Sequence, residues 1–153
     1  MGLRFAPADL DDPQVAALVA SHRSEALANS PPGRAFALDA GGLRDPLVAL
    51  FGAWAADELV GMGALRTLGP DHMELKSMRT LAGRQRQGVG QAMLDHLLAE
   101  ARARGATRIS LETGGNEPFA AARRLYERNG FTRCPPFGDY TESAFNLCYS
   151  LAL

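Results

Sequence analysis

The sequence predicts an α+β domain in which helices cover a mixed β-sheet, and two observations carry this prediction. Three apolar runs, at residues 48–55, 59–68 and 73–80, are joined by turns of hairpin length, which is typical of an antiparallel meander. From Gly88 onward the apolar period changes to the 3.6 residues of an amphipathic helix, and strand and helix then alternate. The 153 residues suffice for one core and are too few for two, so we expect a single domain over residues 1–153.

The first part of the chain is expected to hold one short strand and one long helix. Residues 2–6 are a strand candidate. Asp12 is placed to cap a helix that has Pro13 at its first position, because an aspartate accepts from free backbone amides and a proline lacks one. An apolar stripe then continues to about Asn29, Ser-Pro-Pro-Gly at 30–33 ends the helix, and residues 34–45 form an irregular loop with room for one helical turn.

The last part of the chain alternates two helices with three strands. The helix that opens at Gly88 ends at Arg104–Gly105, where glycine supplies a left-handed cap. Residues 107–113 alternate like a strand, and a second helix starts near 116–118 and ends at Asn129–Gly130. Residues 131–133 and 145–151 complete the predicted sheet.

Charge, hydropathy and cysteine usage exclude several classes of protein. Sixteen Lys and Arg face 17 Asp and Glu, a formal net charge of −1, so the basic excess of a nonspecific nucleic-acid binder is missing. Apolar stretches such as 46–56 are too short and interrupted for a membrane span, and the N-terminus carries no export signal. Cys134 and Cys148 form no metal-ligand pattern, nor do the three histidines. We therefore expect a cytoplasmic protein with reduced thiols, no metal, and no nucleic-acid or membrane partner.

A glycine pair at the mouth of the helix carries the clearest chemical signal. Gly88 and Gly90 follow a strand directly, beside Arg84 and Arg86. Glycines let the backbone approach a ligand, and the free N–H groups and dipole of a helix start favour an anion. A phosphate or pyrophosphate is the natural ligand, although such a pair is also common in a plain turn.

Three phosphate-binding patterns compete for this loop. A P-loop needs Gly-Lys-Ser/Thr, which is absent. A dinucleotide-binding fingerprint needs a small residue at Met93, although Glu112 lies 22 residues after Gly90 at a strand end. The third pattern, Gln85-x-x-Gly88-x-Gly90, resembles the pyrophosphate loop of the GNAT superfamily of acyl-CoA N-acyltransferases.

The resemblance extends over nearly the whole chain. The predicted element order is similar to that of GNAT proteins, and Leu125-Tyr126 with Gly130-Phe131 resembles the family's Leu-Tyr-x-x-x-Gly-Phe signature. Residues 74–80 and 136–140 are similar to small stand-alone bacterial members, the YsnE-like group. The resemblance implies a mostly antiparallel sheet of about seven strands, splayed after the fourth and flanked by about four helices.

The resemblance also implies an acyl-CoA site. Acetyl-CoA would lie in the splay, with backbone groups of Met78, Arg79 and Thr80 on its pantetheine arm, one of them an oxyanion donor. The implied pyrophosphate-binding residues are Gln85, Arg86, Gln87, Gly88, Val89 and Gly90. Asn116 matches a polar position that meets the pantetheine or positions the second late helix; as an alternative it is only a helix cap.

Two residues are implied as catalytic. Tyr126 matches the tyrosine near the CoA sulfur, where a phenol of pKa about 10 can protonate the leaving thiolate; the alternative is a core aromatic side chain. Glu74 occupies the position of a glutamate base in some GNAT enzymes, or it simply pairs with Lys76. Arg79 has two alternative roles: it binds a substrate carboxylate, or it contacts the CoA phosphates.

The function implied is transfer of acetyl from acetyl-CoA to a primary amine of a small molecule or peptide, by direct attack in a ternary complex. A non-catalytic acyl-CoA-binding module and a dinucleotide-binding fold are the alternatives. The acceptor site would lie between residues 23–44 and 135–143, with His72 as a candidate at its mouth and His96 as a structural residue. The identity of the acceptor is left open, as is a homodimer through residues 145–151.

Overall fold

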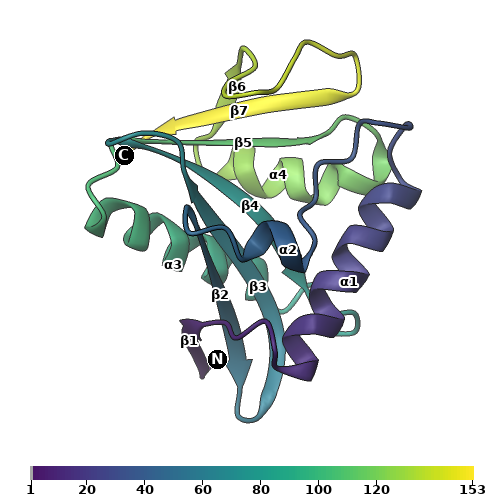
Figure 1. Ribbon diagram of the computed structural model, residues 1–153, viewed down its shortest axis with the longest axis vertical. Helices are drawn as coiled ribbons and strands as arrows, with labels where there is room; N and C mark the ends of the chain where they lie inside the picture. The colour runs from purple at the N-terminus through teal and green to yellow at the C-terminus, as the bar shows by residue number, and fades with distance from the viewer. Residues whose placement is uncertain (1) are drawn as a thin grey trace.

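Figure 1 shows the computed structural model of the chain, which describes residues 2–153. The elements follow in the order β1 (Leu3–Pro7), α1 (Pro13–Ala28), α2 (Ala40–Leu43), β2 (Val48–Ala55), β3 (Glu58–Thr67), β4 (His72–Thr80), α3 (Val89–Ala103), β5 (Arg108–Gly114), η1 (Glu117–Phe119), α4 (Ala120–Arg128), β6 (Thr132–Cys134) and β7 (Asn146–Ala152). This order confirms the predicted α+β class. Each predicted strand and helix is present, including the single helical turn in the loop after α1.

All seven strands form one sheet, in the order β1-β2-β3-β4-β5-β7-β6. The β2–β3–β4 meander is antiparallel as predicted, and the pair β4–β5 is the one parallel pair among the described strands. β7 pairs with β5 along one edge and with β6 along the other. A second copy of the chain therefore meets β7 only where β6 has ended, which restricts the homodimer suggested for residues 145–151.

The helix ends follow the chemistry of their terminal residues. The Asp12 side chain accepts a hydrogen bond from the Gln14 amide at 2.8 Å, with Pro13 at the first position of α1, as predicted. Gly105 after α3 and Gly130 after α4 have φ of 87° and 91°, a left-handed conformation that glycine adopts without a Cβ clash. None of the helices in residues 2–153 combines the length and hydropathy that crossing a bilayer requires.

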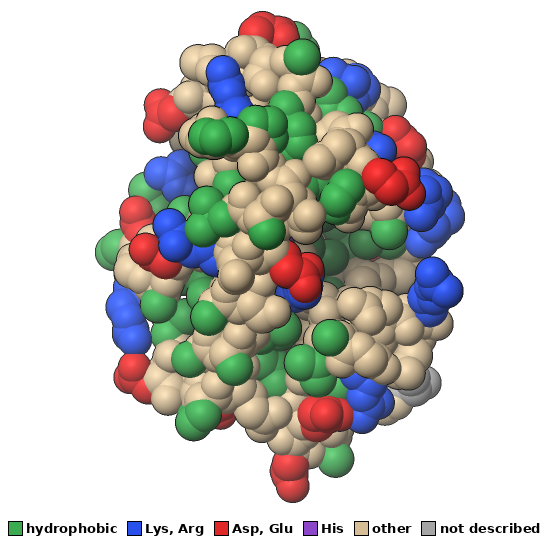
Figure 2. Space-filling model, turned by 90° about the vertical axis from the view of Figure 1, so that its right-hand side faces the viewer, with side chains coloured by type: hydrophobic (Ala, Val, Ile, Leu, Met, Phe, Trp, Pro, Cys, Tyr) green, Lys and Arg blue, Asp and Glu red, His purple; other side chains and the backbone are tan. Residues whose placement is uncertain are grey.

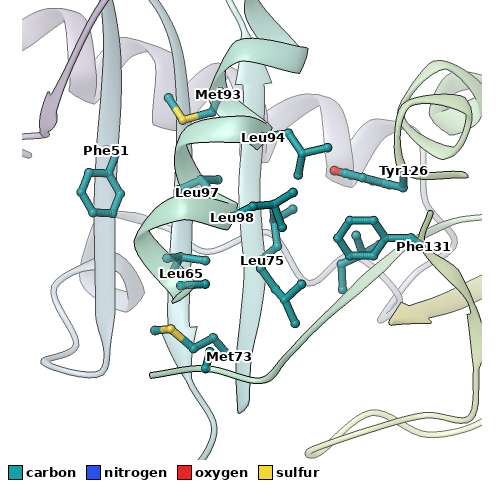
Figure 3. Close-up of a cluster of buried hydrophobic side chains, with 14 of the residues drawn as sticks. Phe51, Leu65, Met73, Leu75, Met93, Leu94, Leu97, Leu98, Tyr126 and Phe131 are labelled. Carbon is teal, nitrogen blue, oxygen red and sulfur yellow. The ribbon is translucent and has the colours of Figure 1, made fainter. Parts of the chain in front are cut away.

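The helices cover both faces of the sheet (Figure 1). α3 and α4 pack on one face over the larger core, whose centre includes Leu94, Leu97 and Tyr126 (Figure 3). α1 and α2 pack on the other face over a smaller core that includes Leu18 and Leu43. A functional site is expected where the sheet between these two layers of helices opens.

The sheet opens between β4 and β5. These strands pair only from His72 to Glu74, opposite Arg108 to Ser110, and then diverge (Figure 1), which confirms the predicted splay after the fourth strand. The β4 edge beyond Glu74 consequently has backbone groups without a strand partner.

A β-bulge lies on this open stretch of β4. Ala64 of β3 faces Lys76 and Met62 faces Arg79, so Ser77 and Met78 together oppose the single residue Gly63. Ser77 has φ of 56°, a conformation uncommon for a residue with a side chain. A Cβ on Gly63 would lie 2.7 Å from Leu97 Cδ1 and 3.0 Å from Met78 Sδ, so glycine is required opposite the bulge. Bulges re-aim backbone groups next to binding sites.

Candidate active site

A cavity fills the opening between the diverging strands. Its walls come from β4, β5, α1, α4 and the loop after α1, and the surface is hollowed near its middle when seen from the α1 side (Figure 2). The polar and aromatic side chains that line it are His22, Ser30, Arg34, Phe36, Glu74, Lys76, Ser77, Glu112, Thr113, Phe119, Tyr126 and Phe145. The two predicted catalytic residues, Glu74 and Tyr126, thus lie in one cavity although 52 positions separate them.

Tyr126 projects from α4 into the core and also lines the cavity. Its ring lies beside Phe131, at 5.7 Å between centroids, and its hydroxyl points toward Leu94 of α3 (Figure 3). The side chain is 6% exposed, and its hydroxyl makes no hydrogen bond to residues 2–153. Burial, and secondarily the charge of Glu112, raises the pKa of Tyr126. Both predicted roles remain open for this tyrosine, because its side chain packs in the core and also lines the cavity.

Glu74 belongs to a buried polar cluster with Lys76 and Tyr140. The Tyr140 hydroxyl donates to Glu74 Oε2 at 2.5 Å, and Lys76 Nζ donates to the same oxygen at 3.2 Å and to the Tyr140 hydroxyl at 2.8 Å. Burial, followed by the charge of Glu74, raises the pKa of Tyr140. The predicted pairing with Lys76 is therefore present, and both partners bind Oε2, which leaves Oε1 for a ligand.

Glu112 is a second carboxylate in the cavity, and the sequence interpretation assigned it no role in an acyl-CoA site. It lies on β5 two residues after Ser110, the partner of Glu74 in the sheet, so both side chains point to the same face. Asn146 Nδ2 donates to Glu112 Oε2 at 2.8 Å. Burial raises the pKa of Glu112. Alternation along β5 was the available signal, but it does not say which strand faces the splay.

His22 of α1 also lines the cavity and was interpreted only as part of the apolar stripe. Burial, with the positive charge of Arg79 as the next cause, lowers the pKa of His22 to about 4. His72, the histidine suggested for the acceptor mouth, does not line the cavity; its Nε2 lies 2.7 Å from Ser110 Oγ. His96 packs against Phe5 and Phe51, as expected for a structural residue.

The loop between β4 and α3 contains three left-handed residues. Gly83, Arg86 and Gly88 have φ of 86°, 63° and 84°. A left-handed residue next to right-handed ones can turn neighbouring backbone N–H groups toward one side, as in an anion-binding nest. Gly88 is the N-cap of α3 without a side-chain cap, so the first amides of the helix have no side-chain acceptor from this residue.

The side chains of this loop divide into structural and free groups. The side-chain oxygen Oε1 of Gln85 accepts a hydrogen bond from the Gly83 amide at 3.2 Å, and Arg84 pairs with Glu58. Val89 is buried in the core. Arg86 is exposed and forms no ion pair within residues 2–153. Backbone amides and Arg86 are therefore what the loop offers to an anion.

A model of the acetyltransferase (GNAT) family matches residues 15–131. The chain belongs to the GNAT family. The match extends from the first turn of α1 to the residue before β6 and includes the splay, the bulge and the loop before α3. This GNAT protein is accordingly an acyl-CoA-dependent acetyltransferase.

Two curated relatives cover most of this GNAT chain. The N-acetyltransferase YsnE of Bacillus subtilis (strain 168), itself uncharacterized, is 46% identical over 134 residues, which are 88% of this chain and 89% of the relative. The N-acetyltransferase YedL of Escherichia coli (strain K12), also uncharacterized, is 44% identical over 145 residues, 95% of this chain and 91% of the relative. Both confirm the predicted family and subgroup.

A solved GNAT structure shares the fold of this chain. The acetyltransferase from Elizabethkingia anophelis, crystallised with acetyl-CoA bound, superposes with a TM-score of 0.66 and 15% identity and covers 99% of this chain and 98% of its own.

In this GNAT protein residues 78–80 lie on the part of β4 that does not pair with β5, and Asn116 directly precedes η1. The side chains of Arg79 and Asn116 are engaged within the protein. Arg79 Nη1 lies 2.5 Å from Glu25 Oε2 of α1, and Arg79 is not among the side chains that line the cavity. Asn116 Nδ2 donates to the Asn29 carbonyl at 2.9 Å, and its side chain does not cap η1. Asn116 therefore ties the end of α1 to the start of α4, and the idea that it is only a cap is wrong.

Within residues 2–153 no group of three or more His, Cys, Asp or Glu side chains is arranged to hold a metal ion. Cys134 and Cys148 are free thiols directly opposite each other on β6 and β7. Burial raises the pKa of Cys134. Burial is also the largest of the causes that raise the pKa of Cys148 to about 11. Neither thiol lines the cavity.

Proposed function

We propose that this acetyltransferase transfers the acetyl group of acetyl-CoA to a primary amine of a small molecule or peptide, by direct attack in a ternary complex. The observation that carries the proposal is the cavity in the splay, with the Tyr126 side chain on its wall and a strand, β4, that leads directly into the loop before α3. The acetyl-CoA bound to the Elizabethkingia relative supports the choice of donor.

The donor would be held mainly by backbone groups. Peptide groups of Met78, Arg79 and Thr80, on the open edge of β4, are available to the amides of an extended pantetheine arm. The bulge at Ser77 supports an oxyanion donor among them. The pyrophosphate would be bound by the backbone of Gln85, Arg86, Gln87, Gly88, Val89 and Gly90, with the Arg86 guanidinium as its counter-charge. Asn116 would position α4 beside the pantetheine.

Tyr126 is the proposed general acid. As the amine nitrogen bonds to the acetyl carbonyl carbon, the C–S bond breaks and the sulfur leaves with the bonding pair. A thiolate in a buried site needs a proton, and the raised pKa of Tyr126 keeps this phenol protonated at neutral pH. Both cysteines lie outside the cavity and are thiols at neutral pH, which supports direct attack over an acyl-cysteine intermediate.

Glu74 is the proposed general base, acting through Oε1 or a bound water. A base is needed because an amine of pKa near 10 is almost entirely protonated at neutral pH and must lose a proton before it attacks. Glu112 is the second candidate, because burial raises its pKa and because its carboxylate accepts one hydrogen bond, from Asn146.

Calorimetry and thiol release test the proposed function together. Acetyl-CoA should bind, NAD should not, and free CoA should accumulate when an acceptor amine is added. NAD binding without CoA binding would identify a dinucleotide fold, whereas CoA binding without turnover of any amine would identify a non-catalytic module. In the same assay Glu74→Gln should lower kcat about 100-fold or more. A loss confined to Glu112→Gln would transfer the role of base to Glu112.

A further inference from the structure

The cavity contains more charge than the transfer chemistry uses. Two acidic residues, Glu74 and Glu112, and two basic residues, Lys76 and Arg34, line it. Glu74 and Lys76 neutralise each other at 3.2 Å in a buried pair. One carboxylate, that of Glu112, and one guanidinium, that of Arg34, remain.

Arg34 forms no ion pair with any carboxylate of residues 2–153. It is half-buried in the loop after α1, and its guanidinium makes one long hydrogen bond, from Nη1 to Thr141 Oγ1 at 3.4 Å. A guanidinium at a cavity wall with one weak partner is available to a planar anion, which it binds through two parallel N–H groups.

Asn146 connects the backbone of Arg34 to the side chain of Glu112. Its Nδ2 donates to the main-chain carbonyl of Arg34 at 3.0 Å and to Glu112 Oε2 at 2.8 Å. Asn146 itself is 8% exposed, and its Oδ1 is buried without a partner. A buried amide with two good hydrogen bonds is costly to displace, so the backbone from which the Arg34 side chain projects is held near the Glu112 carboxylate.

We propose that the acceptor is an amino acid or similar zwitterion, whose carboxylate binds Arg34 while its ammonium group lies beside Glu112 and Glu74. This inference rests on the proposed function and names its substrate class. A molecule that carries both charges matches the unpaired guanidinium and the unpaired carboxylate, whereas a simple amine leaves Arg34 without a counter-ion. The aromatic rings of Phe36, Phe119 and Phe145 line the same cavity and favour an apolar side chain on that acceptor.

The test compares phenylalanine with 2-phenylethylamine and phenylalanine amide, which retain the amine and the ring but lack the carboxylate. Wild-type enzyme should use phenylalanine with the highest kcat/KM. Arg34→Gln should raise KM for phenylalanine about 10- to 100-fold, the value of a charged hydrogen-bonded pair, with kcat and KM for acetyl-CoA unchanged. Arg34→Lys, which keeps the charge and loses the fork, should give an intermediate KM.

Arg44→Gln is the matched control, because Arg44 pairs with Asp11 outside the cavity. It should leave every constant unchanged. Equal use of the three acceptors by wild-type enzyme would overturn the inference, and so would an Arg34→Gln effect of the same size on all of them. No turnover of phenylalanine while another amine reacts also overturns it and leaves the proposed function intact. If acetyl-CoA itself fails to bind, it is the proposed function that fails.

Discussion

At the scale of single residues, the site depends on side chains whose state is set by burial. Tyr126 is the clearest case, because the same apolar surroundings that pack its ring also keep its hydroxyl protonated. Glu112 experiences the same effect with a different consequence, since burial makes its carboxylate hold a proton more strongly. A sequence pattern cannot separate core residues from residues that line a cavity, and Tyr126 is both.

Replacing Tyr126 by Phe tests the acid. The ring remains and no hydrogen bond to the protein is lost, so folding stability and acetyl-CoA affinity should be nearly unchanged. Turnover should fall about 100-fold or more, because the leaving thiolate loses its proton donor. Steady-state kinetics and calorimetry measure the two quantities.

Tyr149→Phe is the control for that substitution. Tyr149 is another buried tyrosine, and its hydroxyl donates to Glu127 at 2.9 Å outside the cavity. Its variant should lose about 1 kcal/mol of stability and no activity. Unchanged turnover in Tyr126→Phe would remove Tyr126 from the mechanism.

At the scale of elements, the strand β4 and the loop that follows it form one continuous structural unit. β4 pairs fully with β3, separates from β5 after Glu74, bulges at Ser77 and runs into the loop of left-handed residues before α3. Each feature exposes backbone groups rather than side chains. The element is therefore suited to a long ligand with amides and phosphates.

Gly88→Val tests this loop. Valine at φ of 84° is strained by about 1–3 kcal/mol, and its branched side chain would stand at the N-terminus of α3, where the pyrophosphate is proposed to bind. Acetyl-CoA binding, measured by calorimetry, should be lost.

Gly105→Val imposes the same backbone strain at the other end of α3. Its φ is 87°, and no atom lies within 4 Å of an added Cβ. This variant should lose comparable stability and keep full acetyl-CoA affinity. Equal affinity in both variants would contradict the loop assignment.

At the scale of the whole molecule, the cavity joins the two layers of helices. His22 and Arg34 come from the α1 side, and Tyr126 comes from α4 on the other side of the sheet. The splay is the passage between them. Folding of the whole chain is thus coupled to the ionisation of groups that line this passage.

The pH dependence of stability should show this coupling through His22. Its pKa is about 4 in the folded state and 6.5 in the unfolded state, so the unfolded chain binds more protons between these values. The free energy of unfolding should therefore rise with pH from about 4 to about 6.5, by at most about 3 kcal/mol from this residue, and less to the extent that water reaches the ring.

Denaturant unfolding at several pH values, for the wild type and for His22→Gln, measures that contribution. The difference between the two curves removes the effect of Glu112, whose raised folded pKa contributes with the opposite sign. The variant should have the flatter curve below pH 6.5. Parallel curves would show that His22 is as easily protonated in the folded state as in the unfolded one.

The sequence by itself determined the elements, their order and the family. Local signals sufficed, because the Asp12 cap, the glycine stops at 105 and 130 and the change of apolar period act within a few residues. The loop at 85–90 and the residues Leu125-Tyr126 identified the family for the same reason.

Only the tertiary structure decided which side chains meet. Glu74 is joined by Tyr140, 66 positions away, and Glu112 by Asn146, 34 positions away. It also decided that His72 is outside the cavity, that His22 and Arg34 are inside, and that Arg79 is engaged by Glu25. The physical reason is that alternation along a strand specifies the face on which a side chain lies, whereas its partner depends on where neighbouring strands separate.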